Sequence, residues 1–529
     1  MLFRSRLDTA PKVNGTMQYA IDFKLPGMLS AAIKDCPVFG GKVKSFDASK
    51  VTGMKGVKKV VQVGDKAVAV VADTWWQAKT ALEALPIVWD KGEGAKVSSE
   101  SIAKWLEEGL TAPTNFVGNK QGDAAAAIAG AAKKVEATYA YPYQNHACLE
   151  PMNATVLYTP DKCEVWTSTQ NGEAAYAAAL AASGLPADKV EVHRLMLGTG
   201  FGRRTRSEYV TEAVLIAKEM PGTPVKMLKS REEDMTNGVY HPVTQCKLTG
   251  SLDKDGNVTG LQMRISGQSI LAYARPEAME AGKDPATFQG LNPGGAEGAF
   301  GYDIPNLLID HAMRNPHVPP WFWRGVNNNQ NAIYLECFID ELAHAAGQDP
   351  LAFRRKMMAN KPKHLGVLNA VAERVGWDKP APQGISRGIC QHMGYGSYVA
   401  AAAEVSVTGN KVKVHRIVAA TNPGHAVNPA QIERQIAGSF VYGLSALFQG
   451  GITIKDGEVV EKNFDTFGSL RMAEMPKVES IIMPSNDFWG GVGEPTIFVA
   501  APAVLNAIFK ATGQRYRSFP LKNHNIQMA

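Results

Sequence analysis

The chain has 529 residues, of which 45% are hydrophobic and 20% charged, and its formal net charge of +6 is spread along its length. A chain of this length forms about two to four domains, and the composition is that of a globular protein. Without a basic run we expect no nucleic-acid partner, and without an apolar run of roughly 18 residues we expect no membrane span.

Six cysteines lie far apart, with no C-x-x-C pair. This spacing excludes the usual iron–sulfur and structural zinc motifs and predicts no disulfide framework. Histidines such as His146, His241 and His317 also lack ligand spacing, so we expect no metal held by protein side chains. If the chain performs redox chemistry, its electrons must leave through another protein.

The first region, residues 1–125, is predicted to be a small α/β domain. Polar residues follow the first six, MLFRSR, directly, so no secretory signal is expected. Hydrophobic periodicity predicts strands at 28–33, 57–63, 67–71 and 86–89, and helices at 74–84 and 98–108. The Ala/Gly-rich tract at 122–132 is interpreted as an inter-domain linker.

Strands and helices alternate through the second region, residues 126–380, and return in the third, residues 381–529. In the second region the predicted strands are 135–141, 164–167, 190–195 and an antiparallel pair at 243–252 and 258–266; the predicted helices are 174–183, 207–219, 331–346 and 350–359. The passage at 277–320 is too long for a simple connector. In the third region we predict strands at 403–407 and 411–419, a hairpin at 451–460, and helices at 429–448 and 501–512. The fold class is mixed α/β.

The sequence WGGVGEP at 489–495 places one carboxylate, Glu494, among glycines. Because glycine has no Cβ, this backbone can pass close to a bulky ligand. Pro495 fixes its own φ and lacks an N–H, which keeps Glu494 out of a helix or a central strand. An acid on a rigid loop is what a general base requires, although a solvated Glu in a glycine-rich turn gives the same pattern.

Two strand-to-helix loops offer polar groups to a ligand. TSTQN at 167–171 supplies neutral donors and acceptors, and it also serves as a helix N-cap without any function. GTGFGRR at 198–204 presents backbone N–H groups and a helix dipole to an anion, to which Arg203, Arg204 and Arg206 would add charge-assisted bonds. Its G-x-G-x-G spacing departs from the dinucleotide-binding fingerprint.

Two more loops precede helices. WFWRGVNNNQ at 321–330 places three aromatic side chains beside Arg324. They could wall a pocket for a flat substrate with Arg324 directed at a heteroatom, or form a surface cluster with a solvated arginine. NPGHAVNP at 422–429 is turn chemistry, and His425 is interpreted as structural.

Together and in this order, these stretches resemble the molybdenum hydroxylases, the xanthine dehydrogenase and aldehyde oxidase family, and in particular the molybdopterin-binding large subunit of isoquinoline 1-oxidoreductase-like enzymes. The stretches that carry the resemblance are RLDTAPKVNG (6–15), VAVVADTWWQAKTAL (68–82), LEPMN (149–153), TSTQN (167–171), GTGFGRR (198–204), SREEDM (230–235), WRGVNNNQNAIYLECFIDELA (323–343), HAVNP (425–429), LRMAEMP (470–476) and GGVGEP (490–495). The resemblance implies a hammerhead-like α/β domain at 1–125 and a two-part molybdopterin-binding domain at 126–380 and 381–529.

The resemblance also implies roles for single residues. Glu494 matches the family's general base, Gln170 the glutamine that hydrogen-bonds an oxo ligand of the metal, and Arg324 the arginine beside the substrate. These side chains are expected to converge on one cavity. The residues implied to bind the cofactor are Gln170, Gly200, Phe201, Gly202, Arg203, Arg324, Gly491, Val492 and Gly493.

The implied cofactor is molybdopterin cytosine dinucleotide, whose dithiolene holds the molybdenum. The implied reaction hydroxylates an N-heteroaromatic or aldehyde substrate with oxygen from water. Electrons would pass to a small [2Fe–2S] subunit and then to a cytochrome c or another acceptor. Thr205 stands where purine-type members carry Glu, which disfavours a purine. The family's M-G-Q-G loop is absent, so we expect a preceding segment that could carry an export signal to the periplasm; otherwise the protein is cytoplasmic.

Two alternatives remain at this point. An NADP-dependent oxidoreductase would use the loop at 198–202 together with Lys229 and Arg231. A catalytically incomplete relative would only bind a partner.

Overall fold

The computed structural model describes residues 8–113, 115–294 and 297–529. The first seven residues, on which the expectation of no secretory signal rests, lie outside this part, and so do two residues of the passage at 277–320. The chain forms two compact units, each assembled from three segments. Unit 1 comprises Met1–Ser98, His146–Val239 and Thr453–Asn463, and unit 2 comprises Ser99–Asn145, Tyr240–Ile452 and Phe464–Ala529.

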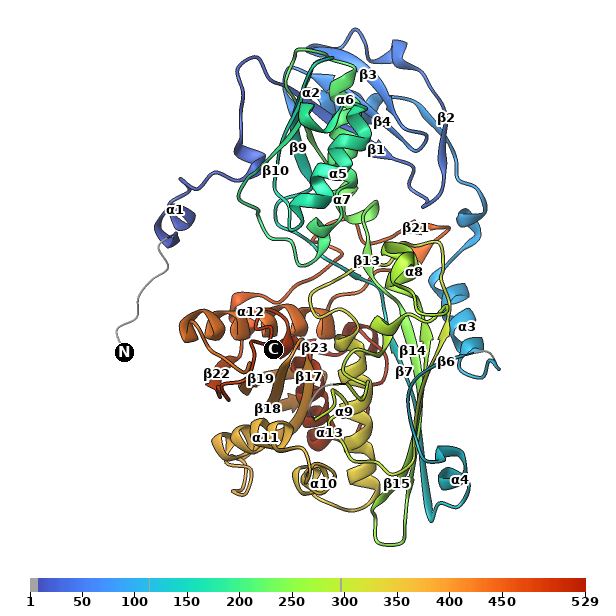
Figure 1. Ribbon diagram of the computed structural model, residues 1–529, viewed down its shortest axis with the longest axis vertical. Helices are drawn as coiled ribbons and strands as arrows, with labels where there is room; N and C mark the ends of the chain where they lie inside the picture. Colours follow the sequence, from blue (N-terminus) through green and yellow to red (C-terminus); the bar gives the residue numbers. More distant parts are fainter. Residues whose placement is uncertain (1–7, 114, 295–296) are drawn as a thin grey trace. The chain divides into compact units, whose positions relative to one another are not determined.

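Unit 1 is organised around a seven-stranded mixed sheet (Figure 1). In spatial order its strands are β11 (Val190–Arg194), β10 (Cys163–Thr167), β9 (Asn153–Tyr158), β12 (Val225–Leu228), β1 (Leu29–Asp35), β4 (Ala67–Ala72) and β3 (Val57–Val63). Every residue of β4, AVAVVA, is buried, because both faces of the sheet are covered. Helices α5 (Gly172–Ser183) and α6 (Glu208–Lys218) pack on one face, and α2 (Trp75–Ala84) packs on the other.

A strand–helix–strand crossover places the loops of interest in unit 1. β10 and β11 are parallel neighbours, and α5 connects them. The carboxyl ends of parallel strands meet at one edge of a sheet. The loop after β10, which contains Gln170, therefore lies beside the loop after β11, which contains Gly198–Gly202.

Unit 1 is completed by small elements. They are the strand pair β2 (Lys42–Phe46) and β5 (Ile87–Asp90), the hairpin β20 (Ile454–Lys455) and β21 (Glu458–Val459), and helices α1 (Thr9–Val13) and α7 (Arg231–Thr236).

Unit 2 contains two sheets that share one hydrophobic core. The first has the order β6 (Phe116–Gln121), β16 (Leu307–Met313), β15 (Val258–Gly267), β14 (Thr244–Leu252) and β7 (Lys133–Tyr141); the second has the order β17 (Ser386–Gly394), β18 (Ser397–Thr408), β19 (Lys411–Asn422) and β22 (Lys477–Ile482), with β23 (Gln527–Met528) also paired to β19. Helices α9 (Asn328–Ala345) and α13 (Ala500–Thr512) lie between the sheets (Figure 1).

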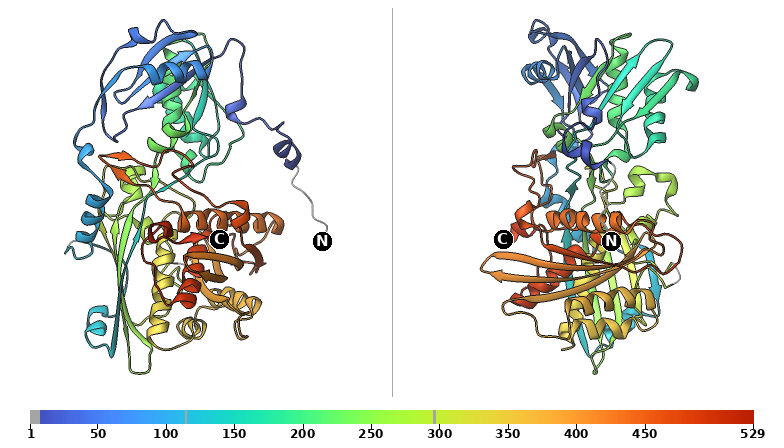
Figure 2. Two further views of the ribbon diagram at one scale, coloured as in Figure 1. Left: turned by 180° about the vertical axis from the view of Figure 1, so that it is seen from behind. Right: turned by 90° about the vertical axis from the view of Figure 1, so that its left-hand side faces the viewer.

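The remaining helices of unit 2 lie around this core. Figure 2 shows α11 (Pro362–Val375) on one side of the orange strands β18 and β19, with α12 (Pro429–Phe448) on the other. The smaller elements are α3 (Ser99–Gly109), α4 (Ala124–Ala129), α8 (Ile270–Ala274), α10 (Pro350–Met357) and the strand pair β8 (Gln144–Asn145) and β13 (Tyr240–His241).

The mixed α/β class predicted from the sequence is confirmed, but some elements differ. The tract at 122–132 is not an extended linker: it contains α4, which begins because the Asp123 side chain accepts a hydrogen bond from the Ala126 N–H at 3.0 Å. It also lies within unit 2, between strands of one sheet. The passage at 277–320 contains a buried strand, β16, that the surrounding glycines and prolines concealed.

Among the described residues, one helical segment, Pro495–Thr512, has the length and apolar composition to cross a membrane. Of that segment, 78% is buried inside the structure, and the core helix of a soluble protein meets the same criterion.

Candidate functional site

Gln170 lies at the carboxyl end of β10 and is tied to the glycine loop beside it. Its side-chain Oε1 accepts hydrogen bonds from the backbone N–H groups of Gly202 at 3.1 Å and Arg204 at 3.2 Å. A Cβ on Gly200 would stand 2.3 Å from this Oε1, so the contact requires glycine there. With Oε1 occupied, the exposed side chain of Gln170 presents its amide N–H₂ as a donor.

The glycine loop itself has an unusual backbone. Thr199, Phe201 and Gly202 have φ angles of +73°, +55° and +105°, all in the left-handed region. The Phe201 ring packs against the core of unit 1. The predicted approach of this loop to a cofactor would therefore involve its backbone.

The arginines after the loop make ion pairs inside unit 1. Arg203 and Arg204 are buried, at 3% and 0% exposure. The Arg203 guanidinium pairs with Glu208, and Arg204 Nη2 lies 3.0 Å from Glu150 Oε2. Both charges are compensated inside unit 1, although Nε and Nη1 of Arg203 are buried without a hydrogen-bond partner among the described residues. The assignment of Arg203 to cofactor binding stays a prediction.

Glu494 lies in unit 2, directly before the 3₁₀ turn Pro495–Ile497. Its Oε1 accepts a hydrogen bond from the Gly325 N–H at 2.8 Å. Burial raises the pKa of Glu494 above its ordinary value of 4.5, while the Gly325 N–H and the Arg324 charge oppose this shift. A carboxylate that is half-buried, held by one donor and more basic than usual has the properties of a general base.

Arg324 braces the loop that carries Glu494. Its Nε donates to the Gly493 carbonyl at 2.7 Å, and its Nη2 donates to both the backbone oxygen and the Oε1 of Gln435, each at 3.2 Å. Gly325, with φ of +98°, leads into α9, and a Cβ there would stand 2.3 Å from Asn329 Oδ1. The structure thus gives Arg324 a bracing role that the sequence did not predict; its contact with a substrate stays a prediction.

The loop before Glu494 presents unpaired backbone donors. The N–H groups of Val492, Gly493 and Glu494 make no hydrogen bond to any group in the part of the chain that the structure describes. Three consecutive N–H groups ahead of a helical turn are thus available as donors to an anion or an oxygen ligand.

Tyr395 is a neighbour of Glu494 that the sequence analysis missed. It lies in the turn between β17 and β18 with φ of +52°, and its carbonyl accepts the Gly491 N–H at 2.7 Å. Burial, and then the charge of Glu494, raise the pKa of Tyr395, so the phenol stays protonated as a donor. Only the flanking glycines in Gly394–Gly396 could have signalled this turn.

The aromatic residues around Arg324 divide into two groups. Trp323 is buried and stacks on Tyr442 with ring centroids 4.4 Å apart. Trp321 and Phe322 form a half-buried cluster in which the Arg275 guanidinium lies 5.2 Å from the Phe322 ring. Thus Trp323 serves the core and is not free to wall a pocket.

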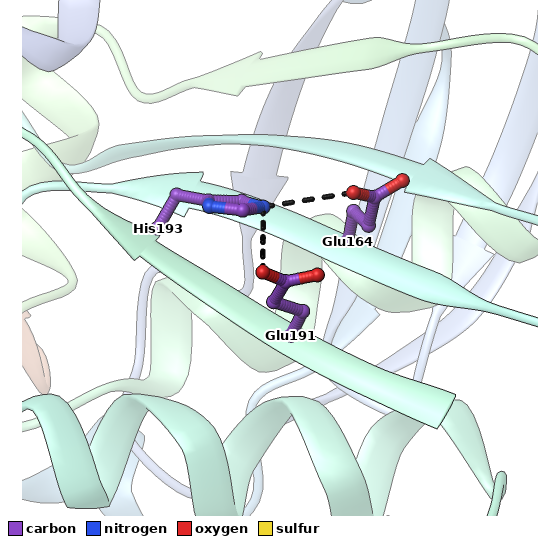
Figure 3. A group of neighbouring side chains, drawn as sticks. All are labelled: Glu164, Glu191 and His193. Carbon is purple, nitrogen blue, oxygen red and sulfur yellow. Dashed lines mark ion pairs between the residues drawn. The ribbon is translucent and has the colours of Figure 1, made fainter. Parts of the chain in front are cut away.

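Glu164, Glu191 and His193 are the one group of acidic, histidine or cysteine side chains in the described residues with the spacing to hold a metal ion (Figure 3). They lie on the neighbouring strands β10 and β11, with His193 Nε2 at 3.6 Å from Glu164 and 3.8 Å from Glu191. The Lys162 ammonium already lies 3.0 Å from Glu164 and 3.2 Å from Glu191. This compensation makes the group an ion-pair network on the surface of the sheet.

The predicted site residues therefore form two groups. Gln170 and Gly200–Arg203 come together in unit 1, and Arg324 and Gly491–Glu494 come together in unit 2. Their convergence on one cavity stays a prediction. The NADP alternative loses a required cation, because Lys229 is fully buried with its Nζ 3.0 Å from both Asp35 and Glu212.

Comparison with known proteins identifies the family of the chain. Two sequence profiles, each described as a molybdopterin cofactor-binding domain, match residues 109–358 and 351–476. The chain is 27% identical to isoquinoline 1-oxidoreductase subunit beta of Brevundimonas diminuta, over 99% of this chain and 68% of that protein. It is also 27% identical to a membrane-bound aldehyde dehydrogenase of Gluconacetobacter polyoxogenes, named for pyrroloquinoline-quinone, over 98% of this chain and 71% of that protein.

The fold has solved counterparts. The crystal structure of quinoline 2-oxidoreductase from Pseudomonas putida 86 matches with a TM-score of 0.81 and 13% sequence identity, covering 98% of this chain and 96% of that chain. The chain therefore belongs to the molybdenum hydroxylase family, as one of its molybdopterin-binding oxidoreductase subunits. The resemblance identified from the sequence is confirmed at this level.

Proposed function

We propose that the protein hydroxylates a small N-heteroaromatic or aldehyde substrate, with Glu494 as the general base. The observation that carries this proposal is the environment of Glu494. The carboxylate is half-buried, held by the Gly325 N–H at 2.8 Å, and its pKa is raised by burial. Family membership supports the reaction class, and this geometry supports Glu494 as the general base.

The residues present fit a molybdopterin cofactor. In unit 1, Gly200 has no Cβ, so the Gln170 side chain fits against it. The Gln170 amide N–H₂ then remains as a neutral donor. In unit 2, the free N–H groups of Val492, Gly493 and Glu494 offer donors to oxygen. Neutral donors suit an oxygen-rich cofactor that brings its own metal ligands. We take this cofactor to be the cytosine dinucleotide form.

A bound molybdenum cofactor would supply the two-electron oxidation and the oxygen transfer. In the balanced reaction a substrate C–H bond breaks and a C–O bond forms, with water as the oxygen source and two protons and two electrons released. Glu494 takes one of these protons from the attacking oxygen. Arg324 and Gly325 keep the carboxylate in position through Gly493 and through the direct N–H bond.

The electrons require a partner. The described cysteines are buried and unpaired, and none of their sequence spacings fits an iron–sulfur cluster. We therefore propose a small [2Fe–2S] subunit as the electron acceptor, with a cytochrome c or a similar protein after it.

The test is metal analysis and dye-linked oxidation of the purified complex, with the Glu494→Gln variant. We expect molybdenum and pterin fluorescence in both proteins, and a loss of about 10²- to 10⁴-fold in kcat for Glu494→Gln, the usual contribution of a general base. Absence of molybdenum from the wild-type complex would overturn the proposal. Unchanged activity in Glu494→Gln would remove Glu494 from the mechanism, and comparing a quinoline with an aromatic aldehyde would decide the substrate class.

A further inference from the structure

The glycine loop at 198–202 holds a backbone conformation that side chains resist. Thr199 and Phe201 carry a Cβ, yet their φ angles are +73° and +55°. Such conformations persist where the surrounding structure over-determines them, and they often mark functional sites. Two buried side chains, Arg204 and Glu150, hold the loop in this conformation.

The Arg204 side chain holds the loop through hydrogen bonds. Its Nε donates to the Thr199 carbonyl at 2.7 Å, and its Nη1 donates to Ser168 Oγ at 2.8 Å. Its Nη2 donates to the Glu150 carbonyl at 2.6 Å and to Glu150 Oε2 at 3.0 Å. One planar guanidinium thus joins three segments that are remote in the sequence, and its side chain is completely buried.

Glu150 completes the arrangement from the other side. Its Oε2 accepts the Gly198 N–H at 2.7 Å, and its Oε1 accepts the Ile21 N–H at 2.9 Å and the Asn153 amide at 3.0 Å. A Cβ on Gly198 would stand 2.5 Å from the Cβ of Glu150. Glu150 therefore fixes Gly198 at the start of the loop, and the Arg204 guanidinium fixes Thr199 beside it.

The backbone of Arg204 also holds Gln170. The Gln170 N–H donates to the Arg204 carbonyl at 3.0 Å, and Gln170 Oε1 accepts from the Arg204 N–H at 3.2 Å. Thr169 Oγ1 donates to the same carbonyl at 3.1 Å. A displacement of Arg204 would consequently move Gln170 and the loop together.

We propose that the buried Glu150–Arg204 ion pair is a positioning device that aims the Gln170 amide and the Phe201–Gly202 backbone at the cofactor. This inference rests on the proposed function. The pair is buried at 5% and 0% side-chain exposure. An apolar pair of similar volume could fill the same space, but it could not make the hydrogen bonds of this pair. The ion pair therefore fixes the orientation of the groups that it hydrogen-bonds.

The experiment replaces both charges at once. The double variant Glu150→Gln/Arg204→Met leaves no unpaired buried charge, so we expect it to fold and to retain molybdenum. We expect faster amide hydrogen exchange in residues 197–205 and a fall in kcat of about 10- to 100-fold, the usual effect of losing a supporting group around a metal site. We expect KM to change much less than kcat.

A matched control comes from unit 2. Arg264 and Asp310 form a buried ion pair on β15 and β16, with Arg264 Nη2 donating to Asp310 Oδ2 at 2.8 Å. The double variant Arg264→Met/Asp310→Asn should leave exchange in residues 197–205 and kcat unchanged.

Unchanged loop exchange and unchanged kcat in the Glu150/Arg204 double variant would overturn the proposal. If that variant fails to fold, Arg204→Lys decides, because lysine keeps the charge opposite Glu150 but lacks the planar fork. Wild-type exchange in Arg204→Lys would equally overturn the positioning role. Hydrogen exchange needs no catalysis, so a wild-type complex that shows loop protection but no molybdenum would contradict the proposed function and leave this pair identified as the support of the loop.

Discussion

At the scale of single residues, Glu494 and Arg324 form an asymmetric pair. Burial raises the pKa of the carboxyl and lowers that of the guanidinium, and each charge partly offsets the other's shift. Their contact runs through the backbone of Gly493 and Gly325, so Arg324 acts on Glu494 by position and by charge. These two effects can be separated by substitution.

The first prediction concerns the acid limb of the pH–rate profile. A general base must be ionised, so kcat/KM falls as pH drops through the raised pKa of Glu494, and the limb lies above pH 4.5. In Arg324→Met the opposing charge is gone, and the limb should move to higher pH. In Arg324→Lys the charge remains, so the limb should stay near its wild-type position although kcat falls. A limb that moves equally in both variants would contradict the electrostatic coupling.

Tyr395 gives the second prediction. The charge of Glu494 acts on its protonated phenol, and Tyr395→Phe removes the hydroxyl while keeping the ring. We expect kcat/KM to fall roughly tenfold, which corresponds to about 1.4 kcal/mol, a typical contribution of one hydrogen bond. Steady-state kinetics with the dye-linked assay would measure this, and Tyr516→Phe, whose hydroxyl donates to Gln514 at 3.1 Å, is the matched control. Equal kinetics for both variants would exclude a role for the Tyr395 hydroxyl.

Sequence reasoning found residues with a local signature and missed those defined by the fold. Glu494 and Gln170 stand in short stretches whose composition announces a loop. The burial of Arg204 depends on Glu150, and the position of Tyr395 depends on Gly491; these contacts join segments that are too far apart in the sequence to be read from it. From the sequence, an arginine beside a glycine loop predicts an anion site. In the structure, Arg203 and Arg204 are each paired with a carboxylate of the same unit.

At the scale of elements, the crossover β10–α5–β11 determines which loops meet. Because β10 and β11 are parallel, Gln170 and the loop after β11 emerge at the same edge, and the Leu195 N–H continues the pairing to Thr167 at 2.9 Å. The sequence predicted both strands and the helix between them. It could not supply their pairing, because the strand order depends on contacts between distant segments.

A third prediction tests the fit of this edge. In Gly200→Ala the new Cβ would meet Gln170 Oε1 at 2.3 Å, so Gln170 must move. We expect a loss of about 1–3 kcal/mol in the free energy of unfolding, typical of overpacking, together with at least a tenfold fall in kcat. Thermal melting and kinetics would measure the two effects.

The comparison for Gly200→Ala is Gly53→Ala in the same unit, where a Cβ would meet nothing within 4 Å. Gly53→Ala should leave both the melting temperature and kcat close to wild type. A wild-type kcat in Gly200→Ala would show that the position of Gln170 does not matter.

At the scale of the whole molecule, each unit buries groups whose shifted pKa values make its stability depend on pH, in opposite directions in the two units. In unit 2, burial lowers the pKa of His241 and His311 to about 4 and that of His392 to about 3. The unfolded chain therefore binds protons below pH 6.5 that the folded unit does not, and these histidines lower its stability as the pH falls. In unit 1, burial and the neighbouring Asp35 charge raise the pKa of Glu233.

The fourth prediction follows for unit 1. Glu233 keeps its proton in the fold above pH 4.5, where the unfolded chain releases it, so its contribution to stability is complete below that pH. The contribution is lost by about 1.4 kcal/mol per pH unit as the pH rises toward the folded pKa. Gln mimics the protonated acid, and its Oε1 can still accept the Asp35 N–H, which Glu233 accepts at 2.7 Å. Glu233→Gln should therefore flatten the stability of unit 1 between pH 5 and 8.

Native-state hydrogen exchange measures this slope in each unit separately. Glu232→Gln, at the exposed neighbouring position on α7, should leave the slope of unit 1 as it is, because the pKa of Glu232 is lowered and it stays ionised across this range. Glu233→Gln should also leave the opposite slope of unit 2 unchanged, because the buried histidines that cause it belong to the other unit. A wild-type slope for unit 1 in Glu233→Gln would mean that the fold holds Glu233 ionised, with Lys229 and not a proton compensating its charge.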